Sequence, residues 1–234
     1  MRKFAFALLA IFFVTNTFAQ EESTDSTSVE ISESEAFYLK PKAVSWGVKA
    51  NVNIASDRNA PENRSRTGFA AGLFMEVRLS DRFSIQPELL YSQQGSWQYL
   101  TYSARTSGDN VLQVDYLNLP ILLKIYVYKN KLSVEVGPQF GYLLSAYEKR
   151  TPRSQTKRRE KIDSDWVNDY DIAAALGVTY KIQPKKWKCP FEVYARYTYG
   201  FMDTYTDDVL QDSQFKYFRD NKNSVIQIGM AARF

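Results

Sequence analysis

Apolar and polar residues alternate in eight segments of the chain. In the first, residues 46–54 (WGVKANVNI), Trp46 and Val48 alternate with Lys49 and Asn51. The same period of two recurs at residues 68–79, 83–95, 115–127, 132–144, 170–180, 191–201 and 224–234. Successive side chains of a β-strand point to opposite faces, so the pattern predicts eight strands that each have one apolar face.

Short and long connections alternate between these segments. Only SDR (80–82) and YKNK (128–131) join the second to the third and the fourth to the fifth, whereas the intervals 95–112 and 144–168 are long. Short periplasmic turns and long outside loops are typical of outer-membrane barrels. The predicted fold is all-β, an eight-stranded antiparallel up-and-down transmembrane β-barrel of outer-membrane type. An even number of strands predicts periplasmic N- and C-termini.

The chain divides into three predicted regions. Residues 1–19 have a basic start, an apolar run from Phe4 to Val14 and a small residue at Ala19, which predicts a cleaved signal peptide. Residues 20–43 are acidic and rich in Ser and Thr, which predicts a disordered periplasmic leader. Residues 44–234 form the predicted barrel, and the signal peptide predicts export to the outer membrane.

Charges at the polar positions of the segments are balanced in sign. An eight-stranded barrel is just wide enough for side chains to fill its interior. Unpaired buried charges are very costly, so we expect these charges to pair across the lumen with a structural role. A narrow ion path is the alternative. The predicted network consists of Lys49, Glu76, Arg78, Glu88, Lys124, Glu135, Asp171, Glu192, Arg196 and Arg233.

Histidine is absent from the sequence. Its absence excludes Ser-His-Asp triads, Cys-His dyads and His-containing zinc sites. The chain has no P-loop or dinucleotide-binding motif. Acidic residues 203–208 (DTYTDD) lack EF-hand spacing and are interpreted as solvated loop residues. The sequence therefore predicts no enzyme, no cofactor, and no catalytic or metal-binding residues.

A basic segment, residues 148–161 (EKRTPRSQTKRREK), lies in the longest predicted outside loop. One interpretation is binding to anionic lipopolysaccharide phosphates; the other is a solvated loop without a ligand. Export by the signal peptide argues against nucleic acid as a partner. The cations of this segment are Lys149, Arg150, Arg153, Lys157, Arg158, Arg159 and Lys161.

The stretches SIQPELLYSQQG, YLNLPILLK, VGPQFGYLL and DIAAALGVTY resemble the PorT-like outer-membrane β-barrel family of Bacteroidetes. The resemblance covers the chain from about residue 44 and implies an integral outer-membrane barrel. The founding member of that family is associated with a secretion and gliding apparatus, and no site residue is carried over. Expected partners are outer-membrane lipid, other envelope proteins and the barrel-insertion machinery, for which Phe234 would be the C-terminal signal.

Three functions remain open from the sequence. The first is a non-enzymatic outer-membrane barrel with a structural, binding or assembly role in the cell envelope. The second is a small outer-membrane channel or transporter. The third is a soluble lipocalin-like barrel, in which the apolar face would point inward.

Overall fold

The computed structural model describes residues 44–58, 64–103, 106–128, 130–152, 158–161, 167–183, 190–204 and 222–234. It describes the backbone alone at residues 98–103, 106–110, 148–152 and 158–161. The predicted signal peptide, the predicted leader and Cys189 lie outside these residues. No helix within the described ranges is long and apolar enough to cross a membrane.

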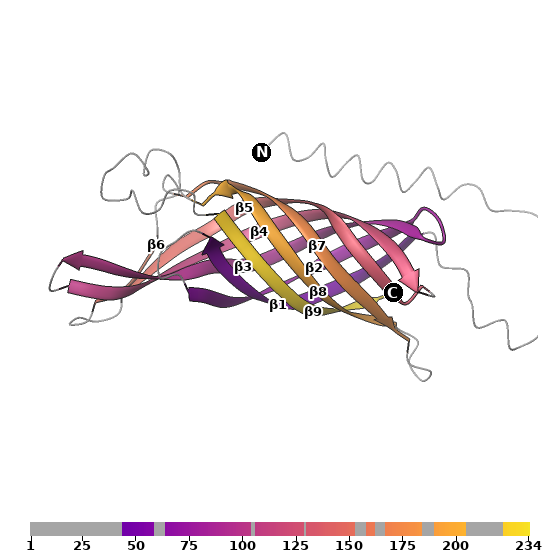
Figure 1. Cartoon of the computed structure of the whole chain (residues 1–234), viewed down its shortest axis with the longest axis horizontal. Coiled ribbons are helices and arrows are strands. Elements are labelled where there is room, and N and C mark those ends of the chain that lie inside the picture. Colours follow the sequence, from indigo (N-terminus) through magenta and orange to yellow (C-terminus); the bar gives the residue numbers. More distant parts are fainter. Residues whose placement is uncertain are drawn as a thin grey trace, which may run out of the picture. The chain divides into compact units, whose positions relative to one another are not determined.

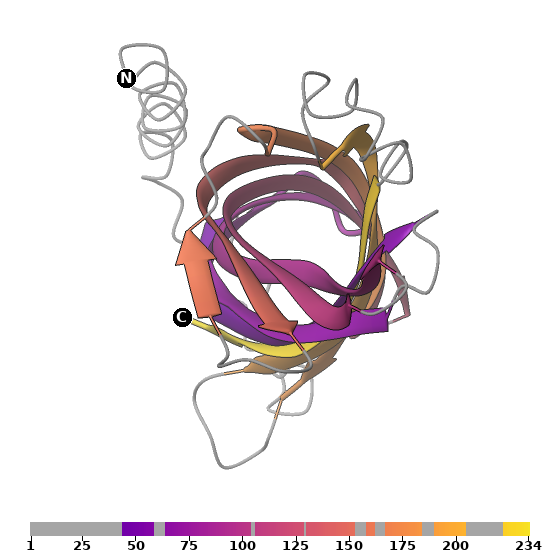
Figure 2. The ribbon, with the colours of Figure 1, turned by 90° about the vertical axis from the view of Figure 1, so that its left-hand side faces the viewer.

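Eight antiparallel strands close into one barrel, as the alternation predicted (Figure 2). Each strand pairs with its neighbours, and β1 pairs with β9 from Gly47↔Arg233 to Arg58↔Lys222, which closes the ring. A ninth strand, β6 (Arg158–Lys161), pairs with β5 outside the ring. The barrel strands are β1 (Val44–Arg58), β2 (Arg64–Arg78), β3 (Phe83–Ser103), β4 (Thr106–Tyr128), β5 (Leu132–Pro152), β7 (Tyr170–Ile182), β8 (Phe191–Asp203) and β9 (Lys222–Arg233).

The large apolar side chains point outward from the barrel. On β7, Ile172, Leu176 and Val178 are exposed, while Ala173 and Ala175 between them are buried. The same alternation runs along β1, β8 and β9. In water an apolar surface of this extent would be strongly unfavourable, and lipid is the solvent that such a barrel wall requires. The inward apolar face of a lipocalin-like barrel is therefore wrong for this chain.

Aromatic side chains mark both edges of the apolar band. Near one edge the rings of Tyr142 and Tyr170 lie 5.6 Å apart, and those of Tyr199 and Phe201 lie 5.4 Å apart. Tyr180 lies near the other edge, ten residues from Tyr170 on the same strand. At about 3.3 Å per residue and a tilt of about 40°, these ten residues span about 25 Å along the barrel axis, the height of a lipid-facing band.

The strands on the side of the long connections extend beyond the predicted segments. Residues 95–103 and 106–112 are paired strand residues of β3 and β4 rather than a loop, and part of 144–168 belongs to β5 and β6. Figure 1 shows these strands continuing past the rest of the barrel. Outside the lipid band both faces of a strand meet water, so the apolar alternation that revealed the other segments fades there.

Candidate functional site

Inward side chains of four strands meet in a central ion group, which consists of Lys49, Glu88, Glu135 and Arg196. The Lys49 Nζ lies 2.6 Å from Glu88 Oε1. The Arg196 guanidinium donates two hydrogen bonds to Glu88, at 2.8 and 2.9 Å, and its Nε donates to Glu135 Oε1 at 2.7 Å. Bidentate pairing of this kind fixes both the position and the plane of a carboxylate.

A second set lies toward the short turns. This turn-side ion group consists of Glu76, Arg78, Lys124, Glu192 and Arg233. Arg233 Nη2 lies 2.6 Å from Glu76 Oε2 and also contacts the Glu192 carboxylate. Lys124 Nζ lies 3.1 Å from Glu192 Oε2, and Arg78 Nη1 lies 3.6 Å from Glu76 Oε1. Each carboxylate of the group therefore has at least one cation.

Gln86 links the two ion groups. Its Oε1 accepts a hydrogen bond from Lys124 at 3.0 Å, and its Nε2 donates to Glu88 at 2.6 Å. The linked side chains reach across the lumen from strands on opposite sides of the ring. Glu88 is 2% exposed and both Lys124 and Glu135 are 0% exposed, so these side chains are buried from solvent.

Asp171 differs from the prediction because it joins neither ion group. Nine of the ten predicted residues make the ion pairs described above, whereas Asp171 forms no ion pair with a residue that the structure describes. Asp171 of β7 lies opposite Gly141 of β5, whereas Glu135 of β5 lies opposite Gly177 of β7. Six residues of strand, about 20 Å, separate these positions, which is beyond the reach of a side chain.

A polar ladder, which consists of uncharged side chains and Asp57, continues from the central ion group along β1 and β3 and includes Tyr194 of β8. Tyr194 donates from its hydroxyl to Asn51 Oδ1 at 2.8 Å, and Asn53 donates to Ser92 Oγ at 3.0 Å. Ser96 donates to Asp57 at 2.5 Å further along. The sequence analysis considered charged positions within the segments and missed this ladder, although Asn51 and Asn53 occupy inward positions of the first segment and Ser92 occupies one of the third.

Apolar side chains fill the part of the interior beyond the ladder. This buried cluster is built by β4 and β5 together with Val167 and consists of Leu112, Val114, Tyr116, Leu143, Ala146 and Val167. The backbone N–H of Leu143 donates to the carbonyl of Asp169 at 2.8 Å, which ties the segment before β7 to the wall. The described interior is thus packed with ion pairs near the turns and with apolar side chains at the opposite end.

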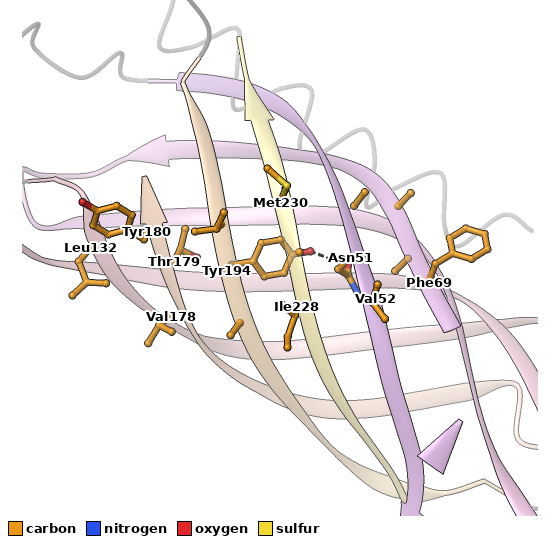
Figure 3. Close-up of a pocket in the computed structure, with 16 residues that line it drawn as sticks. Asn51, Val52, Phe69, Leu132, Val178, Thr179, Tyr180, Tyr194, Ile228 and Met230 are labelled. Atoms are coloured by element: carbon orange, nitrogen blue, oxygen red, sulfur yellow. Dashed lines mark hydrogen bonds between the residues drawn. The ribbon is translucent and has the colours of Figure 1, made fainter. Parts of the chain in front are cut away.

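A hollow of about 830 Å³ lies on the outer wall, across β1, β2, β5, β7, β8 and β9 (Figure 3). Its outward lining is apolar, with Ala50, Ala71 and Ala195 between larger residues such as Phe69 and Met230. The hollow faces lipid and suits hydrocarbon rather than a polar substrate. Within the described ranges, no three acidic or sulfur side chains come together as metal ligands.

The predicted basic loop is partly a β-hairpin. Lys149 and Arg150 belong to β5, and Arg158, Arg159 and Lys161 belong to β6. Arg153 and Lys157 lie outside the described residues. Phe234 lies at the barrel seam, where its N–H donates to the carbonyl of Trp46 at 2.8 Å, and its role as an insertion signal stays a prediction.

Comparisons with known proteins give one family model and several solved structures of outer-membrane proteins. Ail, the attachment invasion locus protein of Yersinia pestis, is 13% identical with a TM-score of 0.43, over 81% of this chain and 98% of that chain. Neisserial surface protein A is 12% identical with a TM-score of 0.42, over 82% of this chain and 98% of that chain. No curated protein matches the chain in sequence. The family model described as "Outer membrane protein beta-barrel domain" matches residues 18–206.

The family model matches most of the chain, and the structure is a closed barrel with an apolar wall that faces lipid. The protein belongs to the outer membrane protein β-barrel domain family and is an integral outer-membrane barrel.

Proposed function

We propose that this protein is a non-enzymatic, non-conducting outer-membrane barrel with a binding or assembly role in the cell envelope. The packed interior is the observation that carries the proposal. Two linked ion groups occupy the lumen near the short turns, and the apolar cluster occupies the other end. Paired, buried charges hold one another in place and offer no site for a permeating ion.

Single-channel recording tests this proposal against the alternative of a small channel or transporter. Purified protein inserted into planar phospholipid bilayers should give no conductance steps. Reproducible steps that depend on insertion of the protein would contradict the packed lumen and would favour the channel. Folded protein is recognised beforehand by a gel mobility that changes on heating, so a silent bilayer is not mistaken for failed insertion.

The extended strands are proposed to lie outside the cell, with both termini in the periplasm. This orientation follows the usual side of short turns in outer-membrane barrels. In a Cys189→Ser background, Thr106→Cys at the hairpin of β3 and β4 should react with an impermeant maleimide on intact cells. Ser80→Cys, in a short turn, should react only after lysis. The reverse labelling pattern would invert the orientation.

An assembly role in a secretion or gliding apparatus is supported by the resemblance to the PorT-like family. Crosslinking in cells, followed by purification of the tagged barrel and mass spectrometry, tests this part of the proposal. A stoichiometric envelope partner is the expected result. Recovery of the barrel alone would count against an assembly role and would leave a role in binding at the cell surface.

A further inference from the structure

The hollow on the outer wall follows the register of the sheet. Its outward lining residues form two rows, in which each residue is the register partner of the next, so both rows cross the strands at right angles. The first row consists of Leu132, Tyr180, Val193, Met230, Ala50 and Ala71. The second row consists of Val178, Ala195, Ile228, Val52 and Phe69. We call the space between the two rows the diagonal groove.

The strand backbones form the floor of the diagonal groove. Residues between the rows, such as Thr179 and Tyr194, also line the hollow, although their side chains are buried on the inward face. Alanine occupies three places in the rows, at Ala50, Ala71 and Ala195. These short side chains leave room on the wall that larger apolar residues would fill.

The diagonal groove runs from one edge of the apolar band toward its centre. Figure 3 shows Leu132 and Tyr180 at one end of the hollow and Phe69 at the other. Tyr180 lies two residues from the turn-side end of β7 at Ile182, whereas Ala71 lies seven residues from that of β2 at Arg78.

The size of the diagonal groove matches one hydrocarbon chain. The groove crosses neighbouring strands from β5 through β7, β8, β9 and β1 to β2, and five strand spacings of about 4.8 Å give a length of about 24 Å. At a strand tilt of about 40°, this path rises about 15 Å along the barrel axis, which is half of a hydrocarbon layer about 30 Å thick. The groove therefore spans about one leaflet.

A cation stands at the edge where the diagonal groove begins. Lys131 directly precedes Leu132 and is exposed. Its carbonyl accepts a hydrogen bond from the N–H of Lys181 at 2.7 Å, which holds the turn beside Tyr180. Lys131 forms no ion pair with any residue in the described ranges. Its ammonium group is therefore free to meet an anion at the level of the lipid headgroups.

We propose that the diagonal groove binds one phospholipid from the leaflet on the side of the short turns. One acyl chain lies between the two rows, and the phosphate contacts Lys131. Because hydrocarbon surrounds the whole apolar band, the groove selects its lipid through closer packing of the chain and through attraction between phosphate and ammonium. The inference goes beyond the proposed function, because it assigns a ligand site to the lipid-facing wall.

Two pairs of matched variants test the chain and the headgroup separately. Ala195→Phe fills the diagonal groove, whereas Ala174→Phe places the same ring on an exposed position of β7, opposite Tyr199 and outside the groove. Lys131→Gln removes the cation at the groove, whereas Arg82→Gln removes an exposed cation from another short turn. Heat-dependent gel mobility verifies that all four barrels are closed.

Native mass spectrometry of the full chain in detergent measures bound palmitoyl-oleoyl phosphatidylglycerol. Dioctanoyl phosphatidylglycerol is the short-chain control, and palmitoyl-oleoyl glycerol is the control without phosphate. The wild type should retain one long-chain phosphatidylglycerol after added detergent has removed the other lipids, and should bind it more tightly than either control.

The two variants at the groove should weaken this binding. We expect a loss of about tenfold for Ala195→Phe through lost packing, and of about fivefold for Lys131→Gln, because a cation near an anionic lipid surface contributes about 1 kcal/mol. Ala174→Phe and Arg82→Gln should stay within about twofold, as is usual for surface substitutions away from a site.

Absence of a retained phosphatidylglycerol overturns the proposal, as does an equal loss in Ala195→Phe and Ala174→Phe. Equal effects of Lys131→Gln and Arg82→Gln, or equal binding of palmitoyl-oleoyl glycerol, exclude a phospholipid as the occupant. A failure here leaves the non-conducting barrel standing, whereas conductance steps would overturn that barrel and leave the lipid site standing.

Discussion

At the scale of single residues, Glu88 holds the central ion group together. Its carboxylate accepts from Lys49 on β1, from both Nη atoms of Arg196 on β8 and from Gln86 on its own strand. Glu135 is the only other acid in that group, and it also accepts from the Thr179 hydroxyl at 3.0 Å. Without Glu88, two buried cations would share one carboxylate.

Replacing Glu88 with alanine should therefore be costly. We expect Glu88→Ala to lower the free energy of unfolding by about 3–5 kcal/mol, since it leaves two buried cations with only one carboxylate between them. Urea unfolding in phospholipid vesicles, followed by tryptophan fluorescence, measures this change.

Asp171→Asn is the matched control, because Asp171 is an inward carboxylate that forms no ion pair with a described residue. Its cost should stay below about 1 kcal/mol, as is usual where no buried network is broken. Similar losses in the two variants would contradict the central ion group.

At the scale of elements, β3 has an unusual backbone conformation at Gly95. This residue has a φ of 129°, a conformation that residues with a Cβ rarely adopt, and a Cβ there would meet the carbonyl of Leu112 on β4. The register of β3 with β4 is unbroken around it. The register of β3 with β2, in contrast, shifts between Ser92 and Ser96, so Gly95 lies where β3 is regular toward β4 and irregular toward β2.

Gly95→Ala should destabilise the barrel by about 1–3 kcal/mol through backbone strain. Gly141→Ala is the control, since Gly141 has no positive φ and its added Cβ would meet side-chain atoms of Asn118 and Asp171 at 3.0 and 3.2 Å. The control should lose less in the same urea assay. Equal losses would mean that the conformation of Gly95 is unimportant.

The sequence predicted the strands that face lipid, because lipid requires apolar residues at alternate positions. It did not predict the strands outside the lipid band. The segments around Leu73, Leu176 and Ile228 were evident because outward positions must be apolar. The inward positions of Glu88 and Arg196 followed from the same alternation. The pairing of β5 with β6 was hidden, because Arg158–Lys161 carries no apolar face and register is weakly specified by such a strand.

Partners inside the lumen were the less predictable part of the site. The sequence indicates which side chains point inward, but the reach of each depends on the stagger between strands. Asp171 illustrates this limit. It points inward like Gly177, which lies opposite Glu135, but it is too far along the strand to pair with the central ion group. Only the register of β5 with β7 places Gly141, rather than a cation, opposite Asp171.

At the scale of the whole molecule, depth in the membrane decides what the outer wall tolerates. Leu176 is 57% exposed and lies midway between Tyr170 and Tyr180, whereas Leu79 is 58% exposed and lies at a short turn. The exposed fractions of the two side chains are nearly equal, so a difference between the costs of the same substitution at the two positions reports their depth in the membrane.

We expect Leu176→Arg to cost about 2–4 kcal/mol and Leu79→Arg about 0–1 kcal/mol, because the penalty for a lipid-facing cation falls toward the interface. Urea unfolding from phospholipid vesicles measures both. Equal costs would place the hydrocarbon layer elsewhere on the barrel.

The seam between β1 and β9 has a consequence for how the barrel forms. Ser45 and Arg233, which are hydrogen-bonded across this seam, lie 188 positions apart in the chain. Contacts of such long range are slow to form, because the entropy of closing the loop is lost before the contact stabilises anything. Until β9 pairs, β1 presents an open edge that invites association with other chains. The chain is therefore most vulnerable to aggregation before closure, and a variant that slows closure would reduce the yield of folded protein even if the finished barrel were fully stable.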